Sequence, residues 1–485
     1  MKKLSISLLV CAILSGLVAC NNEKLCSEAK MLYGFRVKAS SGTMLSAVIG
    51  DDNVVTVKVS PRLDEKVELN GARAYFYVSR GATVTPDPSE PQNFALPGGV
   101  KYTVTSEDGK NKTEYTVTWG ISDPLPYGSG FAFGESGAAK TYIEFGYPGE
   151  MGNWDIESIL YGDLIMYHAY CGDYIVLVSL AYIAANPSSP HCIKIVDKLS
   201  LENAGINLNL GSINISNIKM VTSDYKGRMV AAVVTGGNTE FFYWTAPTEA
   251  PRSAGKINLN MAPFDNVPNN FQVAGDITGN AWITAIANPR GPDGNHYRVK
   301  VTDGVLASTY STVSTGYSSG DGNGFQMISP LDDSDNPSFV VGDTRDGDIN
   351  GSIRGYIINQ LGMTTGVMPP HWNNGLPTWP YWVQTGQRLA RMGGRNPVVS
   401  ALPINGKTYI AFTSGSVWWP SMAVLSADLQ TLAHENLSLT PGPINFNWSF
   451  GYWVDWYYDE DASEAYLSIW IGRWGLFTFR MTCFE

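Results

Sequence analysis

Apolar and polar positions alternate along the first part of the chain, and this pattern predicts short strands. Residues 54–59 are rich in β-branched side chains that alternate with polar ones. Further on, Ala74, Phe76 and Val78 fall on one face of an extended run, and an Asp-Gly turn separates two more such runs. The pattern predicts an all-β chain that begins with an Ig-like β-sandwich over residues 30–120.

A segment rich in proline and glycine, 121–130, reads as a linker, and the long region 131–485 after it has almost no helical periodicity. Strand–turn–strand units recur in this region, at 218–232, 271–283 and 398–412. Each of them is followed by another pair of strand-like runs, and units of four strands are typical of a β-propeller. We expect six or seven blades, with a large β-sandwich as the alternative architecture.

The chain opens with two lysines and a mostly apolar run that ends at Leu17-Val18-Ala19-Cys20. This order is typical of an export signal, and the run is shorter than the roughly 20 apolar residues that a membrane-spanning helix needs. The last four residues resemble a bacterial lipobox, which implies that Cys20 carries a lipid. We therefore expect a signal peptide and lipobox at 1–20, a tether at 21–29, and a protein anchored in a bacterial outer membrane and exposed at the cell surface.

Two regions resemble a group of Bacteroidetes surface lipoproteins that have an N-terminal Ig-like domain of unknown function. The first resemblance rests on the segments 79–86, 102–104 and 108–109, and the second, to the propeller half of the same group, on 223–227 and 405–409. The resemblance implies capture of an extracellular glycan or adhesion to a host surface component. A protein partner in the outer membrane is a further expectation.

The net charge of −11, from 33 Lys and Arg against 44 Asp and Glu, argues against a nucleic-acid partner. Nucleic-acid binding depends on clustered basic side chains, and an acidic body does not provide them. An acidic body also gives no help in binding anionic lipid, so a lipid anchor would have to hold the protein to the membrane.

Aromatic residues gather late in the chain, since most of the tryptophans lie at or after Trp372. Flat aromatic rings stack on the apolar face of a sugar, while Asn and Arg side chains bind its hydroxyls. The loops that combine these residue types predict a ligand-binding site made of Trp372, Asn373, Asn374, Trp379, Tyr381, Trp382, Arg388, Trp418 and Trp419. Core packing, or padding of the outer faces of blades, is the alternative role for these tryptophans.

Asp346, Asp348 and Asn350 stand at alternate positions before a glycine, as in the first half of a calcium-binding loop. The twelfth position of such a loop is Ile357 instead of Glu, which excludes an EF-hand. A shorter Ca²⁺ loop and a plain Asp/Gly turn both remain open, and no other cofactor is expected.

Four cysteines follow the lipobox, and Cys171 and Cys192 lie on neighbouring strand-like runs. A disulfide between these two and a pair of buried free thiols are the alternatives.

The chain contains no His-Glu-x-x-His motif and no Gly-x-Ser-x-Gly motif, so no catalytic residue is assigned. A propeller-type glycoside hydrolase or polysaccharide lyase is an alternative to a binding protein. Hydrolysis would need two carboxylates about 5–10 Å apart, for which Asp455, Asp459 and Glu460 are candidates. A structural subunit of an outer-membrane complex is a third alternative.

Overall fold

The computed structural model describes residues 25–40, 44–59, 69–121, 124–147, 166–259, 271–286, 295–315, 326–343, 354–367, 398–414, 421–436, 453–471 and 474–483. The chain divides into two compact units, Met1–Asp123 and Pro124–Glu485. Nearly all regular structure is strand, and the described helices are α3 (Leu180–Ala185) and the short 3-10 turn η3 (Ile215–Asn217). Within the described ranges, no helix has the length and apolar character needed to cross a membrane.

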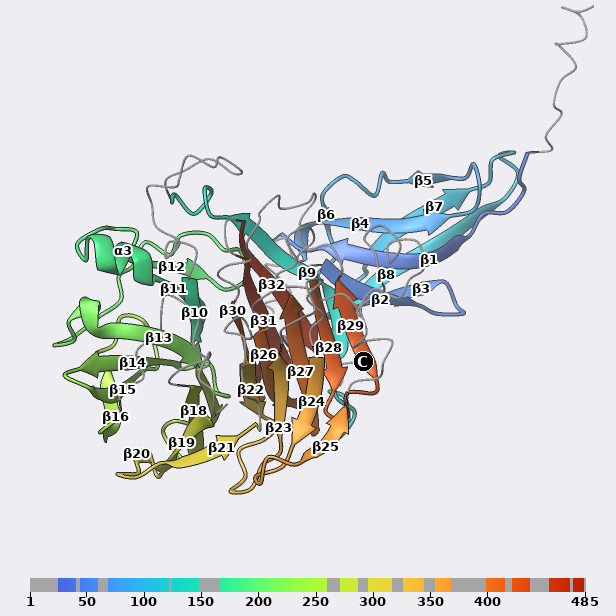
Figure 1. Cartoon of the computed structure of the whole chain (residues 1–485). Coiled ribbons are helices and arrows are strands. Elements are labelled where there is room, and N and C mark those ends of the chain that lie inside the picture. Colours follow the sequence, from blue (N-terminus) through green and yellow to red (C-terminus); the bar gives the residue numbers. More distant parts are fainter. Residues whose placement is uncertain are drawn as a thin grey trace, which may run out of the picture. The chain divides into compact units, whose positions relative to one another are not determined.

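The first unit is a β-sandwich whose strands follow one hydrogen-bonded path, β5-β7-β8-β3-β2-β1-β4-β6 (Figure 1). One strand belongs to both sheets: the first half of β2 (Met44–Ile49) pairs with β1 (Met31–Lys38), and its second half pairs with β3 (Val54–Val59). Such a switch lets one path of strands fold around one core. The other strands are β4 (Asn70–Val78), β5 (Thr83–Thr85), β6 (Gln92–Asn93), β7 (Val100–Thr105) and β8 (Lys112–Ile121).

Alternation in the sequence translates directly into burial in this unit. Ala74 on β4 is buried, whereas its neighbours Tyr75 and Tyr77 are 46% and 61% exposed. The predicted division of this strand into two faces is therefore confirmed. The core that the inner faces share contains Phe94 and Tyr102, both fully buried.

The described strands of the second unit form six sheets. The first three blades are β10 (Met166–Cys171), β11 (Tyr174–Ser179) and β12 (Ile193–Asp197); β13 (Ile218–Ser223), β14 (Met229–Thr235), β15 (Asn238–Trp244) and β16 (Arg252–Ile257); and β17 (Phe271–Gly275), β18 (Ala281–Ile286), β19 (Asn295–Thr302), β20 (Val305–Leu306) and β21 (Ser311–Ser314). The last three are β22 (Gln326–Pro330), β23 (Phe339–Asp343), β24 (Arg354–Ile358) and β25 (Thr364–Val367); β26 (Val398–Ile404), β27 (Lys407–Ser414), β28 (Ser421–Ser426) and β29 (Leu432–Asn436); and β30 (Trp453–Asp459), β31 (Glu464–Ile471), β32 (Gly475–Thr482) and β9 (Ala132–Thr141).

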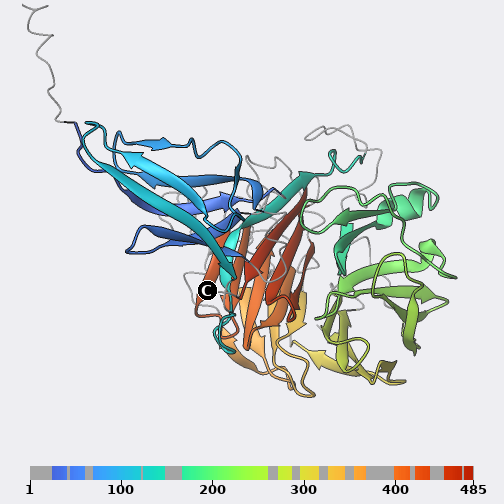
Figure 2. The ribbon, with the colours of Figure 1, turned by 180° about the vertical axis from the view of Figure 1, so that it is seen from behind.

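The described strands of the second unit make a β-propeller of six blades, one of the two predicted blade counts, and not a large two-sheet sandwich. Figures 1 and 2 show the sheets in chain order, from the green first blade to the dark red sixth blade. The sixth blade closes the ring because β9, from the start of the unit, pairs antiparallel with β32, the last strand of the chain. The innermost strands β30, β10, β13 and β17 pack in succession, and so do β22, β26 and β30, but β22 meets the third blade mainly at β18.

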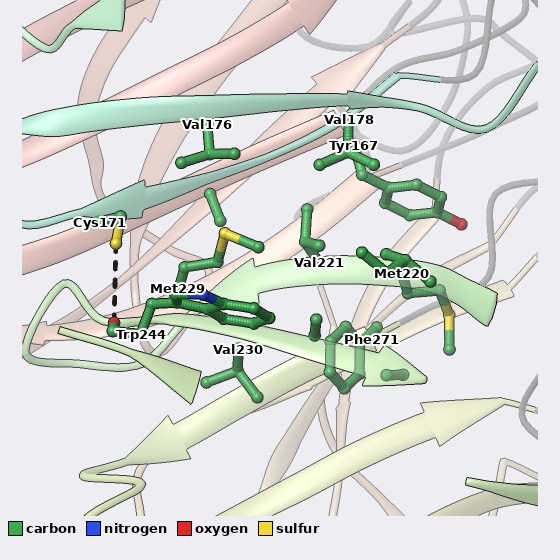
Figure 3. Packing of buried hydrophobic residues seen from close by; sticks show 14 of the residues in the cluster. Tyr167, Cys171, Val176, Val178, Met220, Val221, Met229, Val230, Trp244 and Phe271 are labelled. Carbon is green, nitrogen blue, oxygen red and sulfur yellow. Dashed lines mark hydrogen bonds between the residues drawn. The ribbon is translucent and has the colours of Figure 1, made fainter. Parts of the chain in front are cut away.

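Two large apolar clusters hold the blades together. One joins the first three blades to the sixth, and Figure 3 shows Trp244 and Phe271 within it among aliphatic side chains of β11, β13 and β14. The other joins the fourth, fifth and sixth blades. Trp453, Trp456 and Trp470 of the sixth blade are buried in these clusters, so these three tryptophans are core residues.

Cys171 and Cys192 are both free and buried, so the structure contains the thiols and not the disulfide. β11 lies between β10, which carries Cys171, and β12, which begins directly after Cys192. Two strand spacings amount to about 9–10 Å, more than the roughly 7 Å that a disulfide tolerates. They also lie at opposite ends of β11, since Cys171 pairs with Tyr174 and the Cys192 carbonyl accepts from the Ser179 amide. Each thiol donates to a backbone carbonyl instead. The Cys171 thiol donates to Trp244 (Figure 3), and the Cys192 thiol donates to Asn186.

Candidate functional site: a polar seam between the third and fourth blades

The residues that the sequence predicted to bind a ligand or an ion lie outside the described residues. They are the ligand-binding set Trp372, Asn373, Asn374, Trp379, Tyr381, Trp382, Arg388, Trp418 and Trp419, the calcium-loop set Asp346, Asp348 and Asn350, and the lipidation site Cys20. Among the described residues no cluster of His, Cys, Asp and Glu has the composition of a metal site. These assignments therefore remain predictions.

The three carboxylates considered for hydrolysis do not form one site. Asp455 is buried in the middle of β30, whereas Asp459 ends that strand and Glu460 forms an ion pair with Lys226. Asp459 lies four residue steps along the strand from Asp455, which is about 13 Å. That separation is larger than the spacing of a glycosidase pair.

Polar side chains from the innermost strands meet at the centre of the ring and hydrogen-bond to one another. Ser223 on β13 donates to Asp455 on β30 (2.6 Å), and Ser400 on β26 donates to Gln272 on β17 (2.8 Å). Each of these bonds joins two strands that have another blade between them, so both cross the centre. His168 on β10 is buried there as well, with its Nε2 2.8 Å from the Ser468 hydroxyl.

The charges at this centre are suppressed by burial. Burial raises the pKa of Asp455 to about 7, against the opposing effect of the Ser223 and Thr222 hydroxyls and the Trp456 amide. Burial also lowers the pKa of His168 to about 3, so the imidazole is neutral. The central side chains mostly bond to one another, which gives this cluster a structural role.

The third blade has one apolar and one polar face. Phe271, Ile283 and Val299 point into the large cluster shared with the first two blades. On the opposite face, the strand register places Gln272 beside Thr284 and Thr284 beside Arg298. His296 lies two residues from Arg298 on β19 and therefore shares this face. We call these four residues, Gln272, Thr284, His296 and Arg298, the polar seam.

All four residues of the polar seam are buried, yet they keep polar atoms without a partner. Within the described part of the chain, these atoms are Gln272 Nε2, Thr284 Oγ1, both ring nitrogens of His296, and Arg298 Nε and NH2. Burial lowers the pKa of His296 to about 3, so its ring is neutral. Buried polar groups are normally hydrogen-bonded, and a cluster of exceptions needs an explanation.

Arg298 is 2% exposed and carries a full charge in this seam. Burial lowers the pKa of Arg298 to about 10, while Asp335 and Asp332 act in the opposite direction, so the guanidinium stays protonated at neutral pH. Its carbon lies 3.9 Å from the centre of the Trp282 ring, and NH1 donates to Gln360 Oε1 at 3.3 Å. Among the described residues, no carboxylate forms an ion pair with it.

The fourth blade offers the seam an apolar face. Ile328, Phe339, Val341 and Ile358 form a small separate cluster on that side, and Phe339 lies 5.0 Å from the Arg298 guanidinium. The other blade junctions are filled by the two large apolar clusters. The junction of the third and fourth blades is thus the place where a polar, charged face is buried against an apolar one.

The sequence shows that β19 has a polar face, but strand periodicity alone does not show that this face is buried. In the run 296–301, His296, Arg298 and Lys300 alternate with Tyr297, Val299 and Val301. This alternation predicts a strand whose apolar face packs on the core and whose polar face is exposed to solvent. The fourth blade covers the polar side, which turns an ordinary surface face into a buried one.

Comparison with known proteins gives one family match, over part of the first unit. Residues 40–119 match the family model described as SGBP, N-terminal. No curated protein matches the chain.

Solved structures resemble the chain at low identity. A DUF4623 family protein from Bacteroides eggerthii is 12% identical, with 94% of this chain and 98% of that chain covered and a TM-score of 0.40. A subtype N10 neuraminidase-like protein of A/little yellow-shouldered bat/Guatemala/060/2010 is 9% identical, with 65% and 93% covered and a TM-score of 0.34. The Dos1 propeller is 8% identical, with 64% and 71% covered and a TM-score of 0.29. At these TM-scores the similarity adds nothing to what the strands themselves show.

Proposed function

We propose that this protein is a lipid-anchored surface protein of a Bacteroidetes outer membrane and that its propeller binds a glycan. The observation that carries the proposal is the match of residues 40–119 to the N-terminal part of SGBP proteins. Proteins of that family are surface glycan-binding proteins associated with the outer membrane. The lipobox-like sequence that ends at Cys20 supports the same location.

In this proposal the two units have different tasks. The first unit acts as a spacer, and the second unit presents the binding loops. The loops predicted from the aromatic residues, above all Trp379 and Trp382, would stack on sugar rings, since a flat ring suits the apolar face of a pyranose. Ligand sites are concave and mostly apolar with a few polar groups, and loops held on a rigid sheet framework are suited to form them.

The experiment is native affinity electrophoresis of the protein from residue 21 onward, in gels that contain a single neutral or acidic polysaccharide. We expect at least one polysaccharide to retard the protein, and we expect the Trp379→Ala, Trp382→Ala double variant to migrate faster in that gel. Tyr127→Ala removes an aromatic side chain that is 88% exposed and serves as the matched control, with unchanged migration expected.

Two results would contradict this proposal. If no polysaccharide in a broad panel retards the protein, glycan binding is wrong, and co-purification with an outer-membrane partner would favour the structural-subunit alternative. If the polysaccharide is cleaved, so that new reducing ends or unsaturated products appear, the protein is an enzyme.

A further inference from the structure

We propose that the polar seam is a subsite for a carboxylate, and that the glycan bound by this protein is therefore an acidic one that contains a uronic or similar sugar acid. This inference rests on the proposed glycan-binding function and names the substrate class. It depends only on described residues, and the argument for it does not use the predicted aromatic loops.

The edge of the Arg298 guanidinium that has no hydrogen-bond partner among the described residues has the shape that binds a carboxylate. NH1 of Arg298 is occupied by Gln360, while Nε and NH2 have no partner in the described part of the chain. Nε and NH2 form one planar edge of the guanidinium, and this edge binds the two oxygens of a carboxylate through parallel hydrogen bonds. The stacking of Arg298 on Trp282 fixes the plane of this edge.

The surrounding groups add donors, and the nearby carboxylates of the described residues are engaged elsewhere. Gln272 Nε2 and the Thr284 hydroxyl lie in the same row as Arg298 and are also without partners among the described residues. The two acidic side chains that influence Arg298 have other partners: Asp335 forms an ion pair with Lys300, and Asp332 accepts from the amide and hydroxyl of Ser334. A buried cation is costly to leave unpaired, so pairing with an entering anion would relieve that cost and favour binding here.

Gln360 stands between this cation and the surface. It belongs to the turn after β24, where the adjacent Leu361 is 80% exposed, and its amide also donates to the Pro337 carbonyl at 3.2 Å. The Gln360 oxygen occupies one nitrogen of the guanidinium as a neutral acceptor, and at 3.3 Å the bond is long. A carboxylate is a stronger acceptor than an amide, so displacement of Gln360 would both open the seam and improve the bonding of Arg298.

The test measures binding of oligogalacturonate, a matched neutral oligosaccharide and a sulfated dextran to the purified protein by calorimetry. We expect oligogalacturonate to bind in preference, and we expect Arg298→Gln to weaken this binding by about tenfold to a hundredfold, the usual effect of losing a charged hydrogen-bonding partner. Arg298→Lys keeps the charge but not the planar edge, and we expect a loss of similar size. Arg252→Gln removes an exposed arginine from β16 and is the charge-matched control, with unchanged binding.

A second variant keeps the proposal testable if the Arg298 variants do not fold. Gln360→Ala removes the neutral acceptor and leaves the core intact, and we expect it to bind oligogalacturonate more tightly than the wild type. Unchanged or weaker binding by this variant overturns the inference. Equal affinity for acidic and neutral oligosaccharides also overturns it, although glycan binding would then still stand. Binding of the sulfated dextran alone would overturn the assignment to a carboxylate.

Discussion

The buried carboxyl of Asp455 makes the stability of the propeller depend on pH, and one substitution removes that dependence. Asp455 is 3% exposed and lies where side chains of β13 and β30 meet at the centre of the ring. In Asp455→Asn the amide has the size of the carboxyl, keeps an oxygen acceptor for Ser223, and does not titrate. The variant therefore imitates the neutral carboxyl at every pH.

The sign and size of the effect follow from the pKa in the two states. Burial raises the pKa of Asp455 from 3.8 to about 7, so the folded protein binds this proton more tightly than the unfolded chain does. The stabilising contribution of the proton is complete at pH values below the pKa of Asp455 in the unfolded chain. This contribution is lost as the pH rises through the pKa of Asp455 in the folded protein. The loss is about 1.4 kcal/mol per pH unit between these two pKa values and levels off above the folded one, which gives about 3 kcal/mol between pH 5 and pH 8.

The assay compares the free energies of unfolding of Asp455→Asn and the wild type at pH 5 and pH 8, with denaturant and circular dichroism. We expect the variant to gain about 3 kcal/mol relative to the wild type between these two pH values. Asp303→Asn changes an exposed aspartate in the same unit and controls for the loss of an acidic group. If the difference between Asp455→Asn and the wild type is the same at both pH values, the argument that this carboxyl is neutral in the fold is wrong.

Two further predictions concern the closure of the ring and the cysteines. Gly475→Ala places a methyl group 2.1 Å from the Lys140 carbonyl oxygen at a φ of +146°, so it should separate β32 from β9 and lower the melting temperature. Gly279→Ala is the control and should have a much smaller effect, because the added methyl group would meet no atom nearer than 3.8 Å. The thiol of Cys171 is buried and its pKa is raised by burial to about 12, so it should react with a thiol reagent only after unfolding; rapid modification of Cys171 in the native protein would contradict the structure.

Local patterns accounted for the strands and for the general architecture. The two faces of β4 follow from the alternation of residues 73–79, because side chains in a strand point to opposite sides in turn. The strand–turn–strand units predicted at 218–232, 271–283 and 398–412 are the first two strands of the second, third and fifth blades. Their turns are specified locally by an Asp or Asn together with a Gly, which is why the local sequence reveals them.

The candidate site could not be obtained in the same way. The charged residues of β19 alternate as they would on a surface strand, and no local feature shows that another sheet covers them. The sequence also could not assign a role to the tryptophans of the sixth blade, because an indole in an aromatic-rich run suits a ligand site and a core equally well. Trp453 and Trp470 are only 1% and 3% exposed, and this depends on the packing of neighbouring blades.

The sequence by itself determined that this chain is built of strands, that a sandwich precedes a propeller, and that its N-terminus resembles an exported lipoprotein, because each of these rests on residues close together in the chain. Only the tertiary structure decided that β9 completes the blade of β32, that Cys171 and Cys192 stay apart, and that Arg298 is enclosed without a carboxylate partner among the described residues. Such features depend on which sheets face one another, and burial and pairing between distant segments are properties of that packing.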